Sequence, residues 1–126
     1  MISEFLQNIN IFSNLSESAL HDIEDLFVLR KYPKGSMIIL EEEYGDIVFI
    51  VKTGTVKITR VNDEGKEVIL SLMGVYDIVG ELSIIDGEAR SANVLAQENC
   101  ELYAITREDF LEILKNNFEI SLALMG

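Results

Sequence analysis

Short β-branched runs recur between Ser36 and Ile105, and they constrain the fold more than any other feature of the chain. Seven of the eight glycines lie between Gly35 and Gly87, mostly six to eleven residues apart. Short strands divided this regularly by turn residues are typical of an antiparallel β sandwich or jelly roll. The predicted strands span residues 37–40, 47–51, 55–61, 68–72, 92–96 and 100–105.

Two local patterns inside this region support the prediction of strands. Residues 55–59 alternate between polar and apolar side chains, as a half-buried strand does. The segment Asp63-Glu64-Gly65 stands between two predicted strands. It predicts a hairpin whose glycine occupies the left-handed backbone region.

Helical patterns precede the strand-rich region. Residues 3–10 fit one or two amphipathic turns, and Ser16 is placed to cap a second helix. Pro33, the only proline, ends this helical region. The apolar positions of the second predicted helix are Ala19, Leu20, Ile23, Leu26 and Phe27.

The spacing of the apolar residues becomes helical again after Ile105. Thr106 is a candidate cap, and Asp109 occupies the third helical position. The predicted fold is therefore mainly β with flanking helices: an antiparallel jelly roll, also called a double-stranded β-helix. One face of the C-terminal helix carries the apolar residues Phe110, Leu114, Phe118 and Leu122.

Length and charge set further bounds. A chain of 126 residues predicts a single domain over residues 1–126, and its net charge of −12 argues against direct binding to DNA. No window reaches the ~18 apolar residues of a membrane span, and the N-terminus lacks the basic region of a signal peptide. We therefore expect a cytoplasmic protein without a membrane partner. The chain stops inside an apolar run, so we expect it to be excised from a longer protein.

Metal and redox chemistry have few candidate residues. Cys100 is the only cysteine, and the apolar stretch around it predicts a buried structural thiol. His21 is the only histidine and lies on a helical pattern, where we interpret it as a surface or packing residue. One histidine and one cysteine are too few ligands for a typical zinc or iron site, so no metal and no cofactor is predicted.

The run from Ile78 to Ala92 carries the chemistry of the chain. Gly80 allows close approach of the backbone to a ligand, and N–H groups of a short helical turn over residues 81–85 favour an anion. Arg90 offers a planar fork of donors that matches a phosphate, with the hydroxyl of Ser91 beside it. Glu81 does not favour a phosphate, but it fits a ribose hydroxyl. Taken singly, Arg90 also fits a surface ion pair, Glu81 a helix cap, and Gly80 an ordinary turn.

This run resembles the phosphate-binding cassette of cyclic-nucleotide-binding domains, close to the N-terminal sensor domains of the bacterial catabolite activator (Crp/Fnr-type) regulators. The resemblance extends over nearly the whole chain. One departure is Ala89, where many members have proline, and it affects loop stiffness more than chemistry. The matching turns, hairpin and helix start are Lys34-Gly35, Tyr44-Gly45-Asp46, Thr53-Gly54, residues 63–67 and residues 106–110.

The resemblance implies a role for each residue of the site. Arg90 and Ser91 would hold the cyclic phosphate, and Glu81 would accept a hydrogen bond from the ribose 2′-hydroxyl. Ala92 would stay small to allow close approach. Backbone groups at the turn would come from Gly80, Leu82 and Ser83, and the sugar and base side would be lined by Ile69, Leu70, Ser71 and Val79.

The resemblance also implies a function and partners. We expect a regulatory sensor of cyclic AMP, with cyclic GMP as the second candidate, and Ser91 mildly favours the former. In this interpretation the chain is part of a transcription regulator that forms a homodimer through its C-terminal helix. DNA would be bound only through a domain absent from this chain. Regulatory domains of kinase or channel type are an alternative.

Two other classes of function remain to be weighed. An enzyme on a similar sandwich, such as a cupin, needs a cluster of histidines that His21 alone does not supply. A module of the same fold that only dimerises is favoured by the apolar residues Leu122, Leu124 and Met125. The presence of both Glu81 and Arg90 speaks against that module, because a disused site has no physical need for either.

Overall fold

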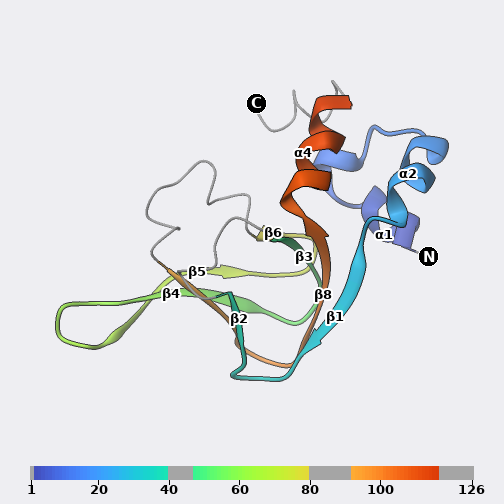
Figure 1. Cartoon of the computed structure of the whole chain (residues 1–126). Coiled ribbons are helices and arrows are strands. Elements are labelled where there is room, and N and C mark those ends of the chain that lie inside the picture. Colours follow the sequence, from blue (N-terminus) through green and yellow to red (C-terminus); the bar gives the residue numbers. More distant parts are fainter. Residues whose placement is uncertain (1, 40–46, 80–91, 117–126) are drawn as a thin grey trace.

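The computed structural model describes residues 2–39, 47–79 and 92–116 and consists of two antiparallel four-stranded sheets with helices at one end (Figure 1). The antiparallel arrangement predicted from the glycine-spaced runs is confirmed. In order across the first sheet, the strands are β1 (Val28–Tyr32), β8 (Cys100–Thr106), β3 (Ile47–Thr53) and β6 (Ile78–Val79). In order across the second sheet, they are β2 (Met37–Ile39), β7 (Asn93–Ala96), β4 (Val56–Val61) and β5 (Glu67–Met73).

The helices cover the outer face of the first sheet. They are α1 (Ile2–Gln7), the 3₁₀ turn η1 (Asn10–Phe12), α2 (Glu17–Glu24) and α4 (Arg107–Asn116). Val48 and Ile50 of β3 are buried in one cluster with Leu6, Leu20 and Phe110 of these helices. The helical end of the molecule is thus fixed to the sheet by apolar burial.

A second cluster fills the space between the two sheets. Phe49 and Val51 of β3 meet Val56 and Ile58 of β4 there, and all four are at most 3% exposed. Neighbouring residues of a strand point to opposite faces. β3 therefore contributes Val48 and Ile50 to the helical cluster and Phe49 and Val51 to the inter-sheet cluster, which explains its unbroken apolar sequence.

The second helix is shorter than predicted. Ser16 caps α2 as expected, with its Oγ accepting a hydrogen bond from the N–H of Ala19 at 3.1 Å. The extension of this helix through Leu26 and Phe27 is wrong, because α2 ends at Glu24 and a turn follows. The next residues form β1, which pairs with β8 along its whole length. Pairing in the sheet outweighed the helical spacing of the apolar residues, and Phe27 is buried without being helical.

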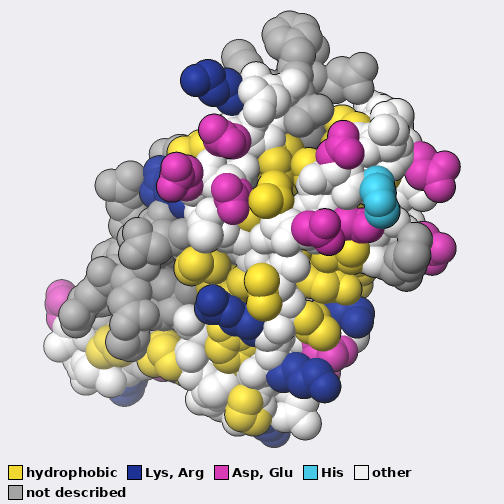
Figure 2. All heavy atoms as spheres, turned by 45° about the vertical axis from the view of Figure 1, so that its right-hand side comes forward, with side chains coloured by type: hydrophobic (Ala, Val, Ile, Leu, Met, Phe, Trp, Pro, Cys, Tyr) yellow, Lys and Arg dark blue, Asp and Glu magenta, His cyan; other side chains and the backbone are white. Residues whose placement is uncertain are grey.

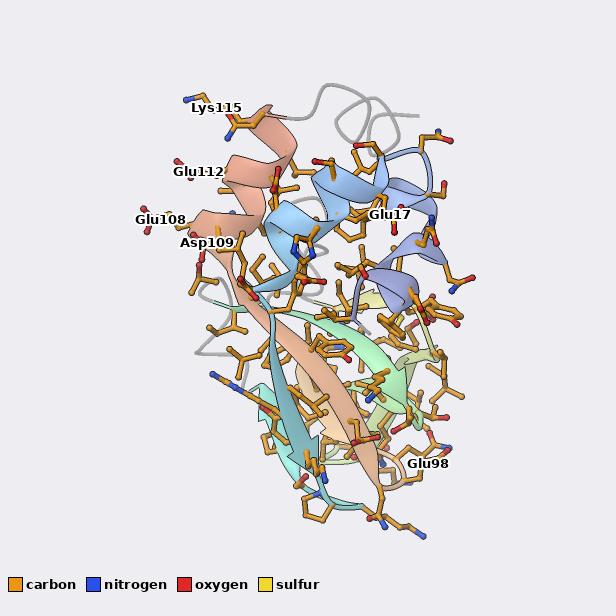
Figure 3. All side chains as sticks on the ribbon, turned by 90° about the vertical axis from the view of Figure 1, so that its right-hand side faces the viewer. Glu17, Glu98, Glu108, Asp109, Glu112 and Lys115 are labelled. Atoms are coloured by element: carbon orange, nitrogen blue, oxygen red, sulfur yellow. The ribbon has the colours of Figure 1, made fainter. Side chains whose placement is uncertain are left out.

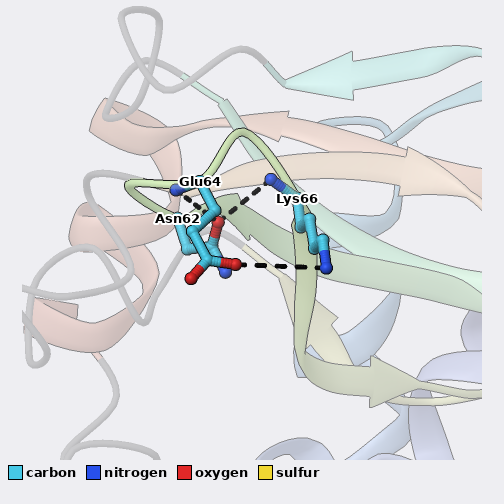
Figure 4. A network of polar contacts seen from close by, with 3 residues as sticks. All are labelled: Asn62, Glu64 and Lys66. Atoms are coloured by element: carbon cyan, nitrogen blue, oxygen red, sulfur yellow. Dashed lines mark hydrogen bonds and ion pairs between the residues drawn. The ribbon is translucent and has the colours of Figure 1, made fainter.

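The hairpin between β4 and β5 has the predicted geometry. Gly65 has a φ of 80°, in the left-handed region. The side-chain Oδ1 of Asn62 accepts hydrogen bonds from the N–H groups of Glu64 and Lys66, both at 3.0 Å (Figure 4). Asn62 therefore closes the turn from its first position, in the manner of an Asx turn.

The start of the C-terminal helix is also confirmed. The N–H of Asp109 donates to Oγ1 of Thr106 at 3.1 Å, so Thr106 caps α4. Phe110 is fully buried, and Leu114 packs against the helical cluster. The predicted helical turn over residues 81–85, Phe118 and Leu122 lie outside the described residues. None of the helices in the described ranges is long and apolar enough to cross a membrane.

Candidate functional site

The two residues that flank the predicted anion-binding run lie in the same buried cluster. Val79 is 1% exposed and stands opposite Phe49 in the pairing of β6 with β3. Ala92 is 0% exposed and comes directly before β7. Since β6 and β7 belong to different sheets, the chain leaves one sheet after Val79 and enters the other after Ala92, inside the same core.

Six of the predicted site residues stand between these two anchors in the sequence. They lie outside the described residues, so their roles stay predictions. They are Gly80, Glu81, Leu82, Ser83, Arg90 and Ser91.

Strand β5 places Ser71 on the inner side of the second sheet. Ser71 stands opposite Ile58, whose side chain is 3% exposed in the inter-sheet cluster. Directly opposite residues in an antiparallel pair share a face. The Oγ of Ser71 also lies 3.6 Å from Sδ of Met73, which packs against the same cluster as Val79 and Ala92. The structure therefore brings Ser71 to the face of the second sheet that packs against the cluster containing both anchors.

Ile69 and Leu70 are placed differently. Ile69 stands opposite Thr59, the neighbour of Ile58 in β4, and Leu70 is the extra residue where the register shifts. Alternation along β4 puts Thr59 and its partner Ile69 on the face opposite to Ser71. The side chains of Ile69 and Leu70 are 53% and 37% exposed. Met73 shares the inner face instead and is not among the predicted site residues, although its spacing of two from Ser71 indicates that face.

Cys100 is buried, as predicted, and makes two close polar contacts. Its Sγ lies 3.2 Å from the carbonyl oxygen of Thr55 and 3.1 Å from that of Glu98, so the thiol has a choice of acceptors. Burial raises the pKa of the Cys100 thiol, while these two backbone contacts act in the opposite direction. The group is therefore held in its protonated form and packs as a small apolar side chain.

His21 lies on the surface. Its side chain is 72% exposed, and Nδ1 lies 2.8 Å from Oε1 of Glu24 on the same helix. In the described part of the chain, no group of three or more His, Cys, Asp or Glu side chains is placed to hold a metal ion.

The architecture is that of a β jelly roll with helices against one sheet and a β6–β7 connection that starts and ends in the core. The family model of the cyclic nucleotide-binding domain matches residues 29–117. The chain therefore belongs to the cyclic nucleotide-binding domain family.

Similar proteins include both bacterial regulators and animal kinases. The chain is 32% identical over 105 residues to the "Cyclic AMP receptor protein" of Thermus thermophilus, covering 83% of this chain and 49% of that protein. It is 33% identical over 125 residues to "cGMP-dependent protein kinase 2" of Homo sapiens, covering 97% of this chain and 16% of the kinase. The chain thus spans about half of the bacterial relative and a much smaller part of the kinase.

A solved structure has the same fold over almost the whole chain. It is the sensor domain of the transcriptional regulator DNR from Pseudomonas aeruginosa, with a TM-score of 0.85 and 25% sequence identity. The match covers 98% of this chain and 83% of that one. The relation to the sensor domains of Crp/Fnr-type regulators, first indicated by the run from Ile78 to Ala92, is confirmed.

Proposed function

We propose that this chain is a regulatory sensor that binds cyclic AMP through the run from Gly80 to Ser91. The observation that carries the proposal is the burial of Val79 and Ala92 in one inter-sheet cluster, within a chain of the cyclic nucleotide-binding family. The two anchors hold both ends of the run in the same buried cluster. A ligand bound by the run is then linked through Val79 to the first sheet and through Ala92 to the second.

The residues of the run have complementary chemistry for a cyclic nucleotide. The guanidinium of Arg90 pairs with the exocyclic phosphate oxygens, and Ser91 donates its hydroxyl to the same group. The carboxylate of Glu81 accepts a hydrogen bond from the ribose 2′-hydroxyl. Backbone N–H groups near Gly80 and Leu82 add donors for the phosphate, and Ser83 completes the turn.

The acidic character of the chain does not oppose this assignment. The net charge of −12 is spread over the whole sequence, and at physiological salt surface charges are screened beyond about 8 Å. A guanidinium within about 4 Å of the phosphate, with aligned N–H groups beside it, is stronger than this distant repulsion. The local donors therefore decide the sign of the binding energy.

The full protein, in this proposal, is a transcription regulator whose DNA-binding domain follows this chain. The bacterial cyclic AMP receptor protein and the DNR sensor domain support a regulator of this kind. Ligand binding shifts the helical segment after Thr106. It does so because the ligand has a different affinity for each of two arrangements of this segment. Such a regulator works in the cytoplasm, performs no catalysis and needs no cofactor. Dimerisation through residues beyond Asn116 belongs to the same proposal.

A second candidate is a regulatory domain that prefers cyclic GMP, as part of a kinase or channel. The observation in its favour is the 33% identity to cGMP-dependent protein kinase 2 over 97% of this chain. The two candidates differ in which ligand stabilises the folded chain more strongly.

Thermal unfolding with added ligands tests both. We expect cyclic AMP at a hundredfold excess over its dissociation constant to add about 2.7 kcal/mol of stability. Cyclic GMP should give a smaller gain, and the non-cyclic 5′-monophosphates should give almost none. A larger gain with cyclic GMP would favour the second candidate. An unchanged melting temperature with every cyclic nucleotide would contradict the proposed function.

A further inference from the structure

The turn that leads into β6 has a left-handed backbone angle at a tyrosine. Residues 74–77 form this turn, which is closed by the N–H of Asp77 donating to the carbonyl oxygen of Gly74 at 3.0 Å. Tyr76 is its third residue and has a φ of 76°. Glycine is the usual residue where a turn needs a positive φ, because it has no Cβ. Gly74 does not have a positive φ, so the unfavourable angle falls on Tyr76.

Hydrogen bonds hold this turn against the end of β3. The N–H of Tyr76 donates to the carbonyl oxygen of Val51 at 2.8 Å, and the N–H of Val51 donates to that of Asp77 at 3.0 Å. Oδ2 of Asp77 also accepts a hydrogen bond from the N–H of Gly74 at 2.8 Å. An unfavourable backbone angle persists only where surrounding contacts maintain it. These three bonds are part of what maintains it here.

The ring of Tyr76 adds a contact with the N-terminal helix. Its centroid lies 4.9 Å from that of Phe5 in α1. Helix α1 lies beside α2, on the side away from α4 (Figure 3). Tyr76 is 40% exposed, and Figure 2 shows further apolar side chains at the surface where the helices meet the sheets. The stacking is therefore a surface contact between α1 and the turn rather than part of the core.

Strand β6 depends on the turn that precedes it. β6 has only two residues, Ile78 and Val79, which stand opposite Ile50 and Phe49 of β3. A strand this short has few ladder hydrogen bonds of its own. The bonds between the turn and Val51 extend the pairing of β6 with β3 by the residues that β6 lacks. The turn therefore helps to fix Val79, the anchor at which the run from Gly80 to Ser91 begins.

We propose that Tyr76 is a positioning residue for the ligand site. Its ring, held by Phe5, fixes the turn, and the turn fixes Val79 at the start of the run. This inference rests on the proposed function, because its consequence is a change in ligand affinity. Without the ring, the start of the run is ordered only when the ligand binds, and this ordering lowers the affinity. The ring of Tyr76 thus has a role that glycine, with the better backbone, cannot supply.

Three variants separate the ring from the backbone angle. Tyr76→Phe keeps the ring, Tyr76→Ala removes it and keeps the unfavourable angle, and Tyr76→Gly removes both. We expect Tyr76→Phe to bind cyclic AMP as the wild type does. The other two should bind about fivefold more weakly, the effect of losing one aromatic contact. In urea, Tyr76→Gly should be more stable than Tyr76→Ala, since glycine adopts a positive φ readily.

Isothermal titration calorimetry, at a temperature where every variant is folded, distinguishes this role from a purely structural one. A residue that only stabilises the fold would leave the affinity unchanged in all three variants, and that result would overturn the inference. Wild-type affinity in Tyr76→Gly together with weaker binding in Tyr76→Ala would also overturn it. Such a result would assign the effect to the backbone angle and not to the ring.

The Phe5 side of the contact gives a second arm and a matched control. Phe5→Ala should lower the affinity by the same factor as Tyr76→Ala, and the double variant should bind no more weakly than either. Multiplying effects in the double variant would contradict a shared contact. Val75→Ala is the control, because Val75 lies in the same turn and its side chain is 46% exposed. It should bind as the wild type does.

Hydrogen exchange of the ligand-free chain tests the positioning without any ligand. In Tyr76→Ala the amide of Val51 should exchange about fivefold faster than in the wild type, and in Tyr76→Phe it should be unchanged. The reference is the amide of Ala96, which donates to Ser36 in the second sheet. Equal exchange at Val51 in Tyr76→Ala and the wild type would overturn the inference. A wild type that binds no cyclic nucleotide would contradict the proposed function, and the exchange rates would still decide whether the ring fixes the turn.

Discussion

The ring of Phe5 stacks on the ring of Tyr76, with 4.9 Å between the centroids and an angle of 37° between the planes. Tyr76 has a φ of 76°, the single positive value among the described residues other than glycine. Its N–H donates to the carbonyl oxygen of Val51 at 2.8 Å, and β6 begins two residues later. The helix α1 therefore packs on the strained turn that leads into β6 and then to Val79.

We expect Phe5→Ala to lower the free energy of unfolding by about 2 kcal/mol. Truncating a fully buried phenylalanine costs about 3–5 kcal/mol, and Phe5 is only partly buried. Loss of its stacking on Tyr76 should account for about 0.5–1.5 kcal/mol of coupling. Urea denaturation of the two single variants, Phe5→Ala and Tyr76→Ala, and of the double variant measures this coupling.

Tyr103 is a second aromatic partner of Phe5. Its ring lies 5.2 Å from that of Phe5, but Tyr103 is in β8 and has no unusual backbone angle. Tyr76→Ala should keep the cost of the left-handed backbone, since alanine shares that cost. Additive effects of Phe5→Ala and Tyr76→Ala would contradict the stacking interaction.

Gly54→Ala should destabilise the protein strongly. Gly54 has a φ of +87°, and an added Cβ would lie 2.5 Å from the carbonyl oxygen of Asn99 and 2.8 Å from Sγ of Cys100. The left-handed backbone costs about 1–2 kcal/mol for alanine, and overpacking adds about 1–3 kcal/mol. Gly35→Ala is the matched control, because its φ is +85° but nothing lies within 4 Å. Equal losses of stability for Gly54→Ala and Gly35→Ala, measured by thermal or urea unfolding, would show that the close approach at Gly54 has no effect.

Burial of the Cys100 thiol predicts that the free energy of unfolding depends on pH above neutrality. Burial raises the pKa of Cys100, so the folded chain keeps this proton at a pH where the unfolded chain loses it. The stabilisation is fully present below the unfolded pKa of about 8.5 and is lost as the pH rises through the folded pKa. Between about pH 8 and pH 10, the wild type should therefore lose more stability than Cys100→Ala. Parallel curves for the two proteins would contradict this.

Much of the strand pattern was predictable because the turns have their own chemistry. The segment Asp63-Glu64-Gly65 predicted the hairpin, and Thr106 with Asp109 predicted the start of α4. Both predictions were possible because a turn and a helix cap depend on residues close in sequence. β1 was not predicted. Its residues continue the apolar spacing of α2, and only its pairing with β8, far away in the sequence, makes it a strand.

The candidate site was predictable in part for the same reason. The motif from Gly80 to Ser91 could be read from local spacing, but the face occupied by Ile69 could not. The register shift at Leu70 turns Ile69 to the face opposite Ser71, and a shift of this kind depends on the partner strand β4. The family resemblance placed Ile69, Leu70 and Ser71 on one site, and strand alternation without the register shift would have kept Ile69 and Ser71 on the same face.

Arg90→Leu tests the proposed phosphate contact. A hydrogen bond to a charged group contributes about 1.5–3 kcal/mol, and an ion pair at close range adds to it. We expect the variant to bind cyclic AMP on the order of 100-fold more weakly. Isothermal titration calorimetry measures the affinity, and Arg60→Leu is a control at an exposed position of β4. An affinity equal to that of the wild type would rule out this role of Arg90.

Glu81→Ala tests the proposed contact with the ribose. The carboxylate would accept a hydrogen bond from the 2′-hydroxyl, so a ligand without this hydroxyl should bind the wild type more weakly. In Glu81→Ala the two ligands should bind equally, because the acceptor is gone. The measurement is the ratio of dissociation constants for cyclic AMP and 2′-deoxy cyclic AMP, with Glu64→Ala at the β4–β5 turn as the control. A ratio unchanged by Glu81→Ala would show that the sugar is recognised by other groups, even if Arg90 holds the phosphate.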